Sequence, residues 1–422
     1  MNMLYIDPGT GSMLFTILIG LIGAGVYSLR LLFVKFRFII SGGKKVEVNT
    51  DKIPFVIFSD NKRYWNIFEP ICKEMDKRGY DVVYMTASPD DPALKCKYKH
   101  IKSQFIGEGN KAFAKLNFLN ARIVLSTTPG LDVYQWKRSK NVDYYIHISH
   151  AASDLSMYRM FGIDHYDAIL VSGKYQEKQV REMEKVGNLP AKEIRLVGIP
   201  YMDEMKKRLI KAGSVKKHPI TILLAPSWGP EAILTKYGEK LIQPLLDTGF
   251  HIIIRPHPQS FTSEKDLLDK LMKKYPNSKQ LEWNHDMDNF DVLRESDLMI
   301  SDFSGVIFDY TLVYDKPVIY TEAKIDLSLY DAWWLKSKPW TITILPKVGH
   351  LLKYENITSL KSLIKKCLSD DKYSKGRDEA RKEAWCFEGE GAVKTVDYLI
   401  AKNKELSSSE EDKWILERFY IQ

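Results

Sequence analysis

Polar residues suited to anion binding stand between two apolar runs in SDFSGVIFDY, which occupies Ser301 to Tyr310. Asp302 and Ser304 are residue types that cap helix N-termini, so a helix is predicted to begin near Ser304. Gly305 has no side chain, which allows a ligand to approach the backbone closely. The first N–H groups of a helix bind anions. The segment therefore predicts either a phosphate site or an ordinary capped helix.

Two carboxylates in this segment are candidates for polar contacts with a ligand. Asp302 and Asp309 lie seven residues apart, which corresponds to two helical turns, so they are predicted to share one face. One of them could bind a ribose or an acceptor hydroxyl. The alternative is an N-cap followed by a solvated Asp309.

A histidine between two prolines follows the apolar run at 251–254, in the sequence Arg255-Pro256-His257-Pro258. Arg255 and His257 could donate hydrogen bonds to phosphate oxygens, and an imidazole can also move a proton near neutral pH. A purely structural histidine is the alternative, but the flanking prolines favour a site. The loop Ala225-Pro226-Ser227-Trp228-Gly229 is a weaker candidate, because Trp228 could simply cover a domain interface.

In the first half of the chain, His150 comes directly after a predicted strand at 143–148. Side-chain alternation puts His147 and Ser149 on one face of that strand and His150 beyond its end. His150 is predicted to face a cleft and to act as a general base toward an acceptor hydroxyl. A capping or hydrogen-bonded histidine is the alternative. The residues predicted to follow on a helix and to form an acceptor wall are Asp154, Tyr158 and Arg159.

These residues require strands and helices that alternate along the chain. Strands are predicted at 54–59, 80–85, 122–126, 143–148, 168–172 and 194–197, with helices at 65–78 and 176–186. After 216–219 the pattern restarts, with strands at 220–224, 251–254, 297–300, 318–320 and 341–345 and helices at 358–368, 372–385 and 393–402. Apolar runs of strand length between helices predict parallel sheets covered on both faces.

The fold class predicted from this order is α/β, with two doubly wound Rossmann-like domains that face a cleft. The predicted domains are 52–213 and 218–402, followed by a polar linker and terminal helix at 403–422. In open α/β sheets, ligands bind beyond the carboxyl ends of the strands. The candidate loops all occupy that position.

The N-terminal segment predicts a membrane anchor. Residues 8–29 carry no charge and are numerous enough to cross a bilayer as a helix. Basic residues follow rather than precede this stretch, so the remainder of the chain is predicted to be cytoplasmic. We therefore expect 1–45 to be a transmembrane helix with a basic flank, single-pass or peripheral at the cell membrane. The alternative is a buried or membrane-surface helix.

The composition indicates a globular protein with a mild positive charge. The chain has 422 residues, 45% hydrophobic and 27% charged, and a formal net charge of +8. This excess suits a phosphate-rich ligand or an anionic membrane surface, and no basic block of the nucleic-acid-binding type stands out. The four cysteines lack CxxC spacing, so neither a zinc site nor a disulfide framework is predicted. No metal and no cofactor is predicted.

Taken together, the loops resemble the CDP-glycerol glycerophosphotransferase family, the enzymes of teichoic acid and related polyol-phosphate polymers, over about 54–399. The segment 301–310 with Lys316-Pro317-Val318 is similar to the signature SDYSSVxFDYxxxxKPV of that family. The loops at 225–228 and 255–258 resemble its APTW and basic HP loops, and 388–392 resembles its acidic, glycine-rich stretch. Two departures mark a divergent member: Gly305 replaces a serine, and Ser149-His150-Ala151 replaces WHG.

The resemblance implies a GT-B glycosyltransferase-type fold, with an acceptor-side first domain and a nucleotide-binding second domain. It implies His150 and His257 as catalytic residues. The donor-binding residues that it implies or that the loops nominate are Ser227, Arg255, Ser301, Asp302, Ser304, Gly305, Asp309, Glu388 and Gly389.

The function expected from this resemblance is a membrane-associated transferase. It moves a polyol phosphate, most simply glycerol phosphate, from a CDP-activated donor to a hydroxyl of a cell-surface glycan or teichoic-acid-like polymer. A lipid-linked or polymeric glycan is the expected acceptor, and nucleic acid is not an expected partner. Two alternatives are a GT-B transferase that uses a nucleotide sugar and a non-catalytic, membrane-tethered scaffold of the same fold.

Overall fold

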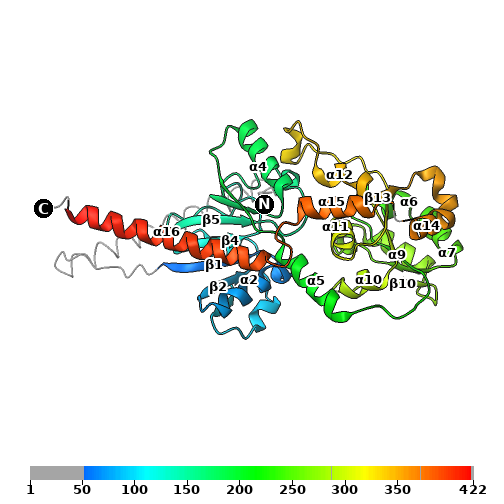
Figure 1. Cartoon of the computed structure of the whole chain (residues 1–422), viewed down its shortest axis with the longest axis horizontal. Helices are drawn as coiled ribbons and strands as arrows, with labels where there is room; N and C mark the ends of the chain where they lie inside the picture. Colours follow the sequence, from blue (N-terminus) through cyan, green and yellow to red (C-terminus); the bar gives the residue numbers. More distant parts are fainter. Residues whose placement is uncertain (1–51, 287, 371, 420–422) are drawn as a thin grey trace, which may run out of the picture. The chain divides into compact units, whose positions relative to one another are not determined.

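The computed structural model describes residues 52–286, 288–370 and 372–419 (Figure 1). From Ile53 onward the chain forms one compact unit that contains two parallel sheets. The predicted anchor at 1–45 lies outside the described residues and stays a prediction. Among the residues that are described, no helix has both the length and the apolarity needed to cross a membrane.

The first sheet has seven strands in the order β3-β2-β1-β4-β5-β6-β7, and all neighbours run parallel. Its strands are β1 (Ile53–Ser59), β2 (Val82–Thr86), β3 (Ile101–Phe105), β4 (Ala121–Ser126), β5 (Val142–Ile148), β6 (Ala168–Val171) and β7 (Glu193–Leu196). The helices of this part are η1 (Lys62–Tyr64), α2 (Trp65–Lys77), η2 (Pro92–Lys95), α3 (Asn110–Leu116), η3 (Leu155–Met157), α4 (Lys174–Gly187) and α5 (Pro200–Ala212).

The second sheet has six strands in the order β10-β9-β8-β11-β12-β13, again all parallel. Its strands are β8 (Thr221–Leu224), β9 (His251–Ile254), β10 (Leu281–Trp283), β11 (Leu298–Ser301), β12 (Val318–Tyr320) and β13 (Gly349–Leu351). Its first helices are α6 (Ile233–Tyr237), α7 (Glu239–Asp247), α8 (Ser260–Ser263), α9 (Lys265–Lys274), α10 (Phe290–Glu295), α11 (Val306–Phe308) and the π-helical turn η4 (Asp309–Val313). The later ones are η5 (Asp331–Trp333), α12 (Trp340–Thr343), α13 (Leu345–Val348), η6 (Tyr354–Ser359), α14 (Leu360–Ser369), α15 (Ser374–Ala384) and α16 (Gly391–Phe419).

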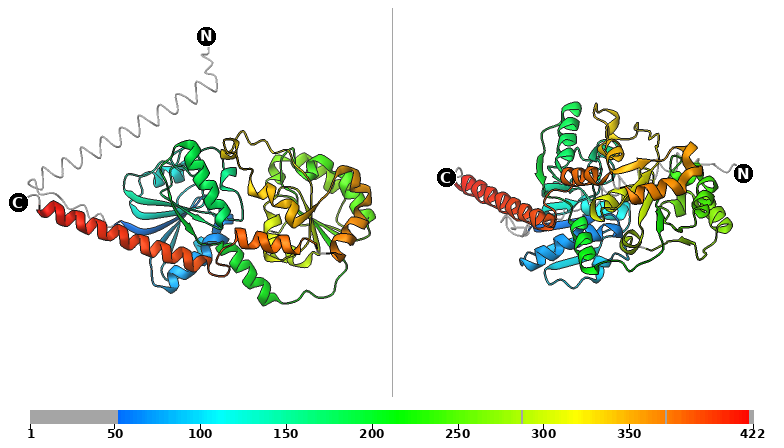
Figure 2. Two further views of the ribbon diagram at one scale, coloured as in Figure 1. Left: turned by 45° about the horizontal axis from the view of Figure 1, so that its top comes forward. Right: turned by 45° about the vertical axis from the view of Figure 1, so that its right-hand side comes forward.

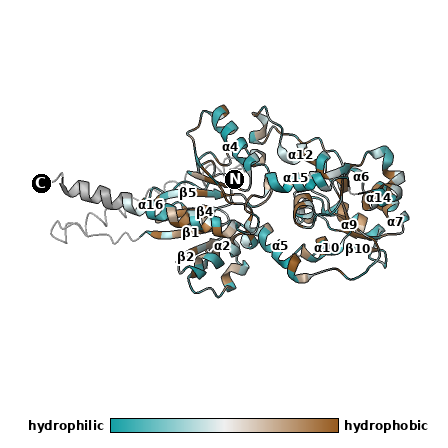
Figure 3. Cartoon of the chain, viewed as in Figure 1, coloured by the Kyte–Doolittle hydropathy of each residue, from teal (hydrophilic) through white to brown (hydrophobic). Residues whose placement is uncertain are grey.

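Both sheets have the doubly wound strand order, which confirms the predicted α/β class. Helices lie on both faces of each sheet (Figure 2). Side-chain alternation therefore feeds two cores, one per face. In β1, Phe55 and Ile57 join one hydrophobic cluster while Val56 and Phe58 join another. Hydropathy follows this plan, with hydrophobic strands inside and hydrophilic residues on the surrounding helices (Figure 3).

The prediction of a polar linker at 404–412 before a separate terminal helix is wrong, because α16 continues as one helix from Gly391 to Phe419. It packs against α2 and β4 of the first half, so the chain crosses back after the second sheet (Figure 1). Polar residues at the start of this stretch form bonds within the helix and with the first half. Lys402 forms ion pairs of 2.8 Å with both Glu193 and Glu405, and the Ser407 hydroxyl donates to the Asn403 carbonyl.

The predicted strand at 341–345 is also wrong, because this segment is helical in α12 and α13. Three strands were not predicted at all, namely β3, β10 and β13. They lie at or toward the outer edges of the sheets or are short, as in IKSQF for β3 and LEW for β10. Polar edge strands lack the apolar run that makes a central strand visible in a sequence.

Asp154 joins the two halves and explains why α12 begins where it does. Its carboxylate accepts hydrogen bonds from the backbone N–H groups of Trp340 at 2.7 Å and Thr341 at 2.9 Å, and from the Thr341 hydroxyl. Gln179 donates to the same buried carboxylate. The predicted role of Asp154 in an acceptor wall is therefore wrong, because its oxygens are occupied inside the junction.

Aromatic packing completes this junction. The centre of the Trp340 ring lies 4.4 Å from the ring centre of Tyr175 in the first half and 5.1 Å from that of Phe308 in the second. One hydrophobic cluster consequently runs through both halves.

A second buried carboxylate, Asp203 of α5, binds the segment between α15 and α16, where the chain crosses back to the first half. It accepts hydrogen bonds from the Trp385 indole at 2.9 Å, the Gly389 N–H at 2.7 Å and the Gly391 N–H at 2.8 Å. A Cβ at Gly391 would lie 2.7 Å from the Asp203 carboxylate, and one at Gly198 would lie 2.2 Å from the Cys386 carbonyl. The glycines of this crossing are therefore required by close packing.

We expect Asp154→Ala to lower the free energy of unfolding by about 2–4 kcal/mol, because it leaves buried N–H groups of α12 without an acceptor. Chemical denaturation followed by circular dichroism would measure the loss. Asp266→Ala, at an exposed position in the first turn of α9, is the control and should change stability by less than about 0.5 kcal/mol. Equal stabilities of the two variants would contradict the role of Asp154 in the junction.

Candidate active site

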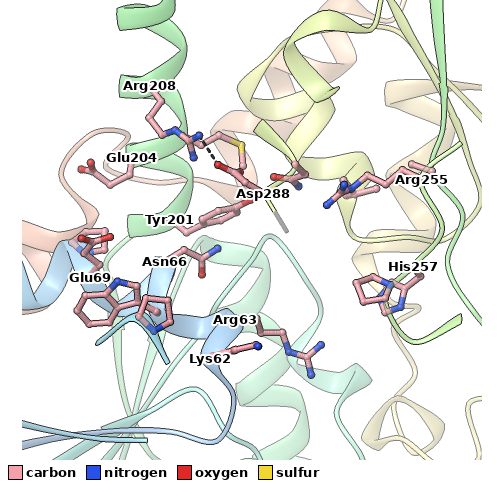
Figure 4. A pocket seen from close by; sticks show the side chains of 18 of the residues that line it. Lys62, Arg63, Asn66, Glu69, Tyr201, Glu204, Arg208, Arg255, His257 and Asp288 are labelled. Carbon is pink, nitrogen blue, oxygen red and sulfur yellow. Dashed lines mark hydrogen bonds and ion pairs between the residues drawn. The ribbon is translucent and has the colours of Figure 1, made fainter. Parts of the chain in front are cut away.

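A cavity of about 580 Å³ lies between the strand-end loops of the two halves (Figure 4). The first half contributes η1, one face of α2, one face of α5, and the residues Pro92 and Tyr98. The second half contributes the loops after β8, β9, β10 and β11. The cavity therefore sits beyond the carboxyl ends of both sheets, where ligands bind in open α/β folds.

The loop after β1 places two cationic side chains in the cavity wall. The sequence analysis did not predict them. The Asn61 side chain accepts a hydrogen bond from the Arg63 N–H at 3.1 Å and so starts the short helix η1. This turn carries Lys62 and Arg63 to the cavity, with the exposed Arg63 guanidinium 5.3 Å from the centre of the Tyr64 ring. Ligands bind beyond strand ends, and this rule was applied to the loop after β8. Applied to the loop after β1, it would have predicted Lys62 and Arg63.

One face of α5 forms a second wall. Tyr201, Glu204 and Arg208 recur at helical spacing and all line the cavity. Arg208 forms an ion pair of 2.5 Å with Asp288, which Figure 4 marks with a dashed line. The guanidinium of Arg208 also lies 4.1 Å from the Phe290 ring centre, so it is held from both sides.

Arg255 and His257 both line the cavity, as predicted for the loop after β9. Arg255 is held by the Asn284 side chain and donates to the Asp286 carbonyl at 2.7 Å. Nδ1 of His257 accepts a hydrogen bond from the Gln259 N–H at 3.1 Å. The neutral ring therefore carries its proton on Nε2 and can only donate there. Burial, helped by the charge of Arg63, lowers the pKa of His257.

Asp302 organises the loops instead of contacting a ligand, which corrects its predicted donor-binding role. Its fully buried carboxylate accepts hydrogen bonds from four backbone N–H groups, those of Ser227 (2.9 Å), Ile233 (2.8 Å), Phe303 (2.7 Å) and Ser304 (3.1 Å). Burial raises the pKa of this carboxyl even though these bonds favour its charged form.

Ser301 and Ser227 also hold the loops together, and neither lines the cavity. The Ser301 hydroxyl donates to the Ala225 carbonyl at 2.6 Å, and Ser227 is buried with its N–H on Asp302. These bonds tie the β8 and β11 loops together. Ser304 is the member of the predicted set from this segment that lines the cavity.

The predicted helix starts two residues later than expected and without a side-chain cap. α11 begins at Val306, and its cap is Gly305 with φ −59°, a conformation open to any residue. A Cβ at Gly305 would meet nothing within 4 Å, so the space in front of this backbone is open. In the described part of the chain, the N–H groups of Gly305 and Val306 have no acceptor. They remain available to a ligand beside Ser304.

Asp309 does not share a face with Asp302, because α11 passes directly into the π-helical turn η4. Its carboxylate turns toward α5 and accepts a hydrogen bond from the Tyr201 hydroxyl at 3.3 Å. Burial raises the pKa of Asp309 to about 7. Asp309 thus supports Tyr201, which lines the cavity, from behind.

His150 lies next to the cavity and not in its wall. Nδ1 of its ring lies 2.9 Å from the Thr127 hydroxyl and 3.4 Å from the Tyr158 hydroxyl. The Tyr64 ring, next to Arg63, lies 5.3 Å away. In the described part of the chain, Nε2 of His150 has no hydrogen-bond partner and is free to exchange a proton. Burial, followed by the charge of Arg63, lowers the pKa of His150 to about 4.

Tyr158 is the residue of the predicted acceptor wall that reaches His150. Its hydroxyl bridges Nδ1 of His150 and Nε2 of His147, the latter at 3.3 Å. His147 is fully buried, and burial lowers its pKa to about 3. Arg159 is exposed and pairs through its backbone with Tyr330, away from the cavity lining. The predicted acceptor wall is therefore reduced to Tyr158 beside His150.

Glu388 and Gly389 do not line the cavity, so the structure does not bring them together with the other predicted donor residues. They belong to the crossing before α16, where the Gly389 N–H binds Asp203 and Glu388 lies 4.0 Å from Lys206. Asp203 and Lys206 face away from the side of α5 that carries Tyr201 and Arg208. The helix therefore separates this glycine-rich stretch from the cavity.

The charge of the cavity favours an anionic ligand. Its cationic lining residues are Lys62, Arg63, Lys73, Arg208 and Arg255, and its anionic ones are Glu69, Glu204 and Asp288. Asp288 is already paired with Arg208. Arg63 and Arg255 come from opposite halves and have no carboxylate partner among the described residues. Two unpaired guanidinium groups on facing walls suit a diphosphate.

A sequence comparison identifies the family. The model of the CDP-Glycerol:Poly(glycerophosphate) glycerophosphotransferase family matches residues 44–400. The chain belongs to this family. The predicted resemblance is thereby confirmed, and the match includes every loop that forms the cavity. Among curated proteins, none matches the chain significantly.

Solved structures show the same fold at low sequence identity. The structure of S. aureus MnaA with UDP is 13% identical with a TM-score of 0.54, and the alignment covers 82% of this chain and 95% of that one. The UDP-GlcNAc 2-epimerase of Methanocaldococcus jannaschii is 13% identical with a TM-score of 0.53, covering 82% and 99%. The chain therefore has two parallel α/β domains of the GT-B glycosyltransferase type. The family to which it belongs supports a transferase.

We expect the pKa of His150 to rise in Arg63→Ala, because removing a neighbouring positive charge favours the imidazolium. The pKa should stay below the ordinary value of 6.5, since burial is the larger cause of its depression. Titration of labelled histidine rings by NMR would measure this shift. His350 is the internal control, because the cations that lower its pKa are Lys372 and Lys366. An unchanged His150 would contradict the proximity of Arg63.

Proposed function

We propose that the chain transfers a polyol phosphate, most simply glycerol phosphate, from a CDP-activated donor to a hydroxyl of a cell-surface glycan or teichoic-acid-like polymer. The observation that carries this proposal is the cationic cavity between the strand ends of the two halves, in a chain of this family. A lipid-linked or polymeric acceptor and an association with the membrane are part of the proposal.

The second half would hold the donor. The pyrophosphate lies between the Arg255 guanidinium and the Nε2–H of His257, and the N–H groups of Gly305 and Val306 approach it from the β11 loop. These groups are pre-positioned, because Asn284 fixes Arg255, Gln259 fixes His257 and Asp302 fixes the loop. Fixed donors directed at a developing charge are the largest source of catalysis in phosphoryl transfer.

The first half would supply the acceptor side. His150 accepts the proton of the attacking hydroxyl at Nε2 while its Nδ1 donates to Thr127. The pKa of about 4 keeps the free base available at neutral pH. A bound dianionic donor offsets the charge of Arg63, so the pKa of His150 rises toward the useful range when the substrate is in place.

The chemical step is a displacement at phosphorus. The acceptor oxygen forms a bond to the phosphorus atom that carries the polyol, and the bond from that phosphorus to the bridging pyrophosphate oxygen breaks. CMP leaves with that bridging oxygen, and the hydroxyl proton goes to His150. Arg63 and Arg255 lie on either side of the reacting phosphate and stabilise its negative charge.

A second candidate is sugar transfer from a nucleotide sugar. Structures of the same fold carry UDP or UDP-GlcNAc in their names, and the same strand ends can bind any nucleoside diphosphate. The nucleotide base separates the two reactions experimentally. A non-catalytic scaffold is the third reading, motivated by Gly305 and the altered sequence around His150.

We expect CDP-glycerol or CDP-ribitol to raise the thermal unfolding temperature of the full chain more than UDP-sugars at the same concentration, because binding to the folded state alone stabilises it. Differential scanning fluorimetry in detergent with CMP, CDP, UDP and both CDP-polyols gives the comparison. Stabilisation by UDP-sugars alone would favour sugar transfer. No stabilisation by any nucleotide would contradict both enzyme readings.

Three substitutions test the roles of His257 and His150. His257→Ala should lower kcat/KM for polyol-phosphate transfer by about 100-fold, as loss of one fixed hydrogen-bond donor does. His257→Gln, which keeps a donor near the Nε2 position, should recover part of that loss. His150→Ala should lower kcat by about 100-fold or more with donor binding retained. Release of CMP from CDP-glycerol in the presence of acceptor is the assay.

The control for these variants is His165→Ala, an exposed histidine of the first half that does not line the cavity. It should keep wild-type activity. If cells expressing His150→Ala and His257→Ala at normal levels still make the polymer, the scaffold reading holds and the catalytic proposal is wrong.

A further inference from the structure

Four large apolar side chains gather on a surface that the proposed reaction does not use. Phe161, Leu329, Trp333 and Trp334 are 50%, 60%, 57% and 52% exposed. Phe161 belongs to the loop after η3 in the first half, and the others belong to the segment around η5. Phe161 and Trp334 also line one small depression together with Val186 of α4. We call these four residues the aromatic face.

The two loops that carry the aromatic face are fastened to each other. The Met160 N–H donates to the Leu329 carbonyl and the Asp331 N–H donates to the Tyr158 carbonyl, each at 3.3 Å. The buried carboxylate of Asp331 accepts the Phe161 N–H at 2.9 Å. These hydrogen bonds hold the two loops in place, so the apolar side chains are exposed on an ordered surface and not on a loose loop.

Two features of the aromatic face are energetically unfavourable, which indicates that it has a function. Phe161 has φ +67°, a left-handed conformation that a bulky side chain rarely adopts. Neighbouring large apolar side chains are also kept in contact with water, which marks interaction surfaces. Strained residues persist where the surrounding structure fixes them for a function. Here Asp331 fixes Phe161 outward.

The rim of the aromatic face is cationic. Arg159, Lys185, Lys336 and Lys338 are exposed beside it, and none of them forms an ion pair within the described residues. Of the nearby carboxylates, Glu182 accepts from the Lys336 and Ser337 N–H groups, Asp331 is internal, and the half-buried Asp164 lines the depression, so cations outnumber exposed carboxylates. Unpaired cations around exposed tryptophans are the composition that binds the headgroup region of an anionic bilayer.

We propose that the aromatic face rests on the surface of a membrane that contains anionic lipids, with Trp333 and Trp334 at the level of the headgroups. This contact is separate from the anchor predicted at the N-terminus. It rests on the proposed function in one respect: the fastened loop carries Tyr158, whose hydroxyl contacts His150. Docking of the aromatic face therefore brings the acceptor histidine near lipid-linked hydroxyls.

The test measures whether Trp333 and Trp334 themselves contact lipid. The full chain can therefore be used, even if another segment also binds the vesicle. The protein is bound to vesicles of phosphatidylcholine and phosphatidylglycerol that contain brominated acyl chains, which quench tryptophan on contact. We expect quenching in the wild type and loss of most of it in Trp333→Phe/Trp334→Phe, which keeps the apolar rings. Trp228→Phe, at another exposed tryptophan, is the matched control and should change little.

Charge is tested by Lys336→Glu/Lys338→Glu, which should reduce the quenching, and by vesicles without phosphatidylglycerol, which should do the same. Quenching that is unaffected by the Trp333/Trp334 change would overturn the proposal. Oligomers in light scattering that dissociate in Trp334→Glu, without lipid quenching, would show that a second copy covers the face instead. Stabilisation by CDP-glycerol in detergent needs no bilayer, so failure of the proposed function is distinguished from failure of membrane docking.

Discussion

Two buried carboxylates at the junction of the sheets determine where every other group can act. Asp154 accepts the first N–H groups of α12 from the other half, and Asp203 accepts those of the crossing before α16. Each would be costly to bury without several donors, and each is fully supplied. Together with the packing of Trp340 between Tyr175 and Phe308, they bring the carboxyl ends of two separate sheets to one cavity.

Within the second half, another buried carboxylate likewise binds several backbone N–H groups. Asp302 binds four backbone N–H groups and thereby shapes the loops after β8 and β11, while Ser301 closes the link between them. The most recognisable motif of the chain therefore acts largely through its backbone. Its side chains fold inward, and the open space before Gly305 and Val306 is what they leave for a ligand.

Arg63 links the electrostatics of the two halves. Burial lowers the pKa of His257 and of His150, and the charge of Arg63 adds to both shifts, although the two rings belong to different domains. Both imidazoles are consequently neutral near pH 7, one held as a hydrogen-bond donor by Gln259 and the other with a free nitrogen. An anion bound against Arg63 would change the proton affinity of both rings at once, which couples donor binding to proton transfer.

The sequence by itself determined the α/β class, most strands and the loops with binding residues, because buried strands and strand-end loops leave local patterns of apolar runs, prolines and glycines. It identified Arg255, His257 and Ser304, which line the cavity. Only the tertiary structure decided that Asp154, Asp302 and Glu388 serve the framework, since local spacing does not reveal which distant N–H group a carboxylate meets. It also decided that Lys62 and Arg63 face His257, because that meeting depends on how the two sheets pack. It decided as well that 404–412 is helical, because α16 as a whole packs against the first half.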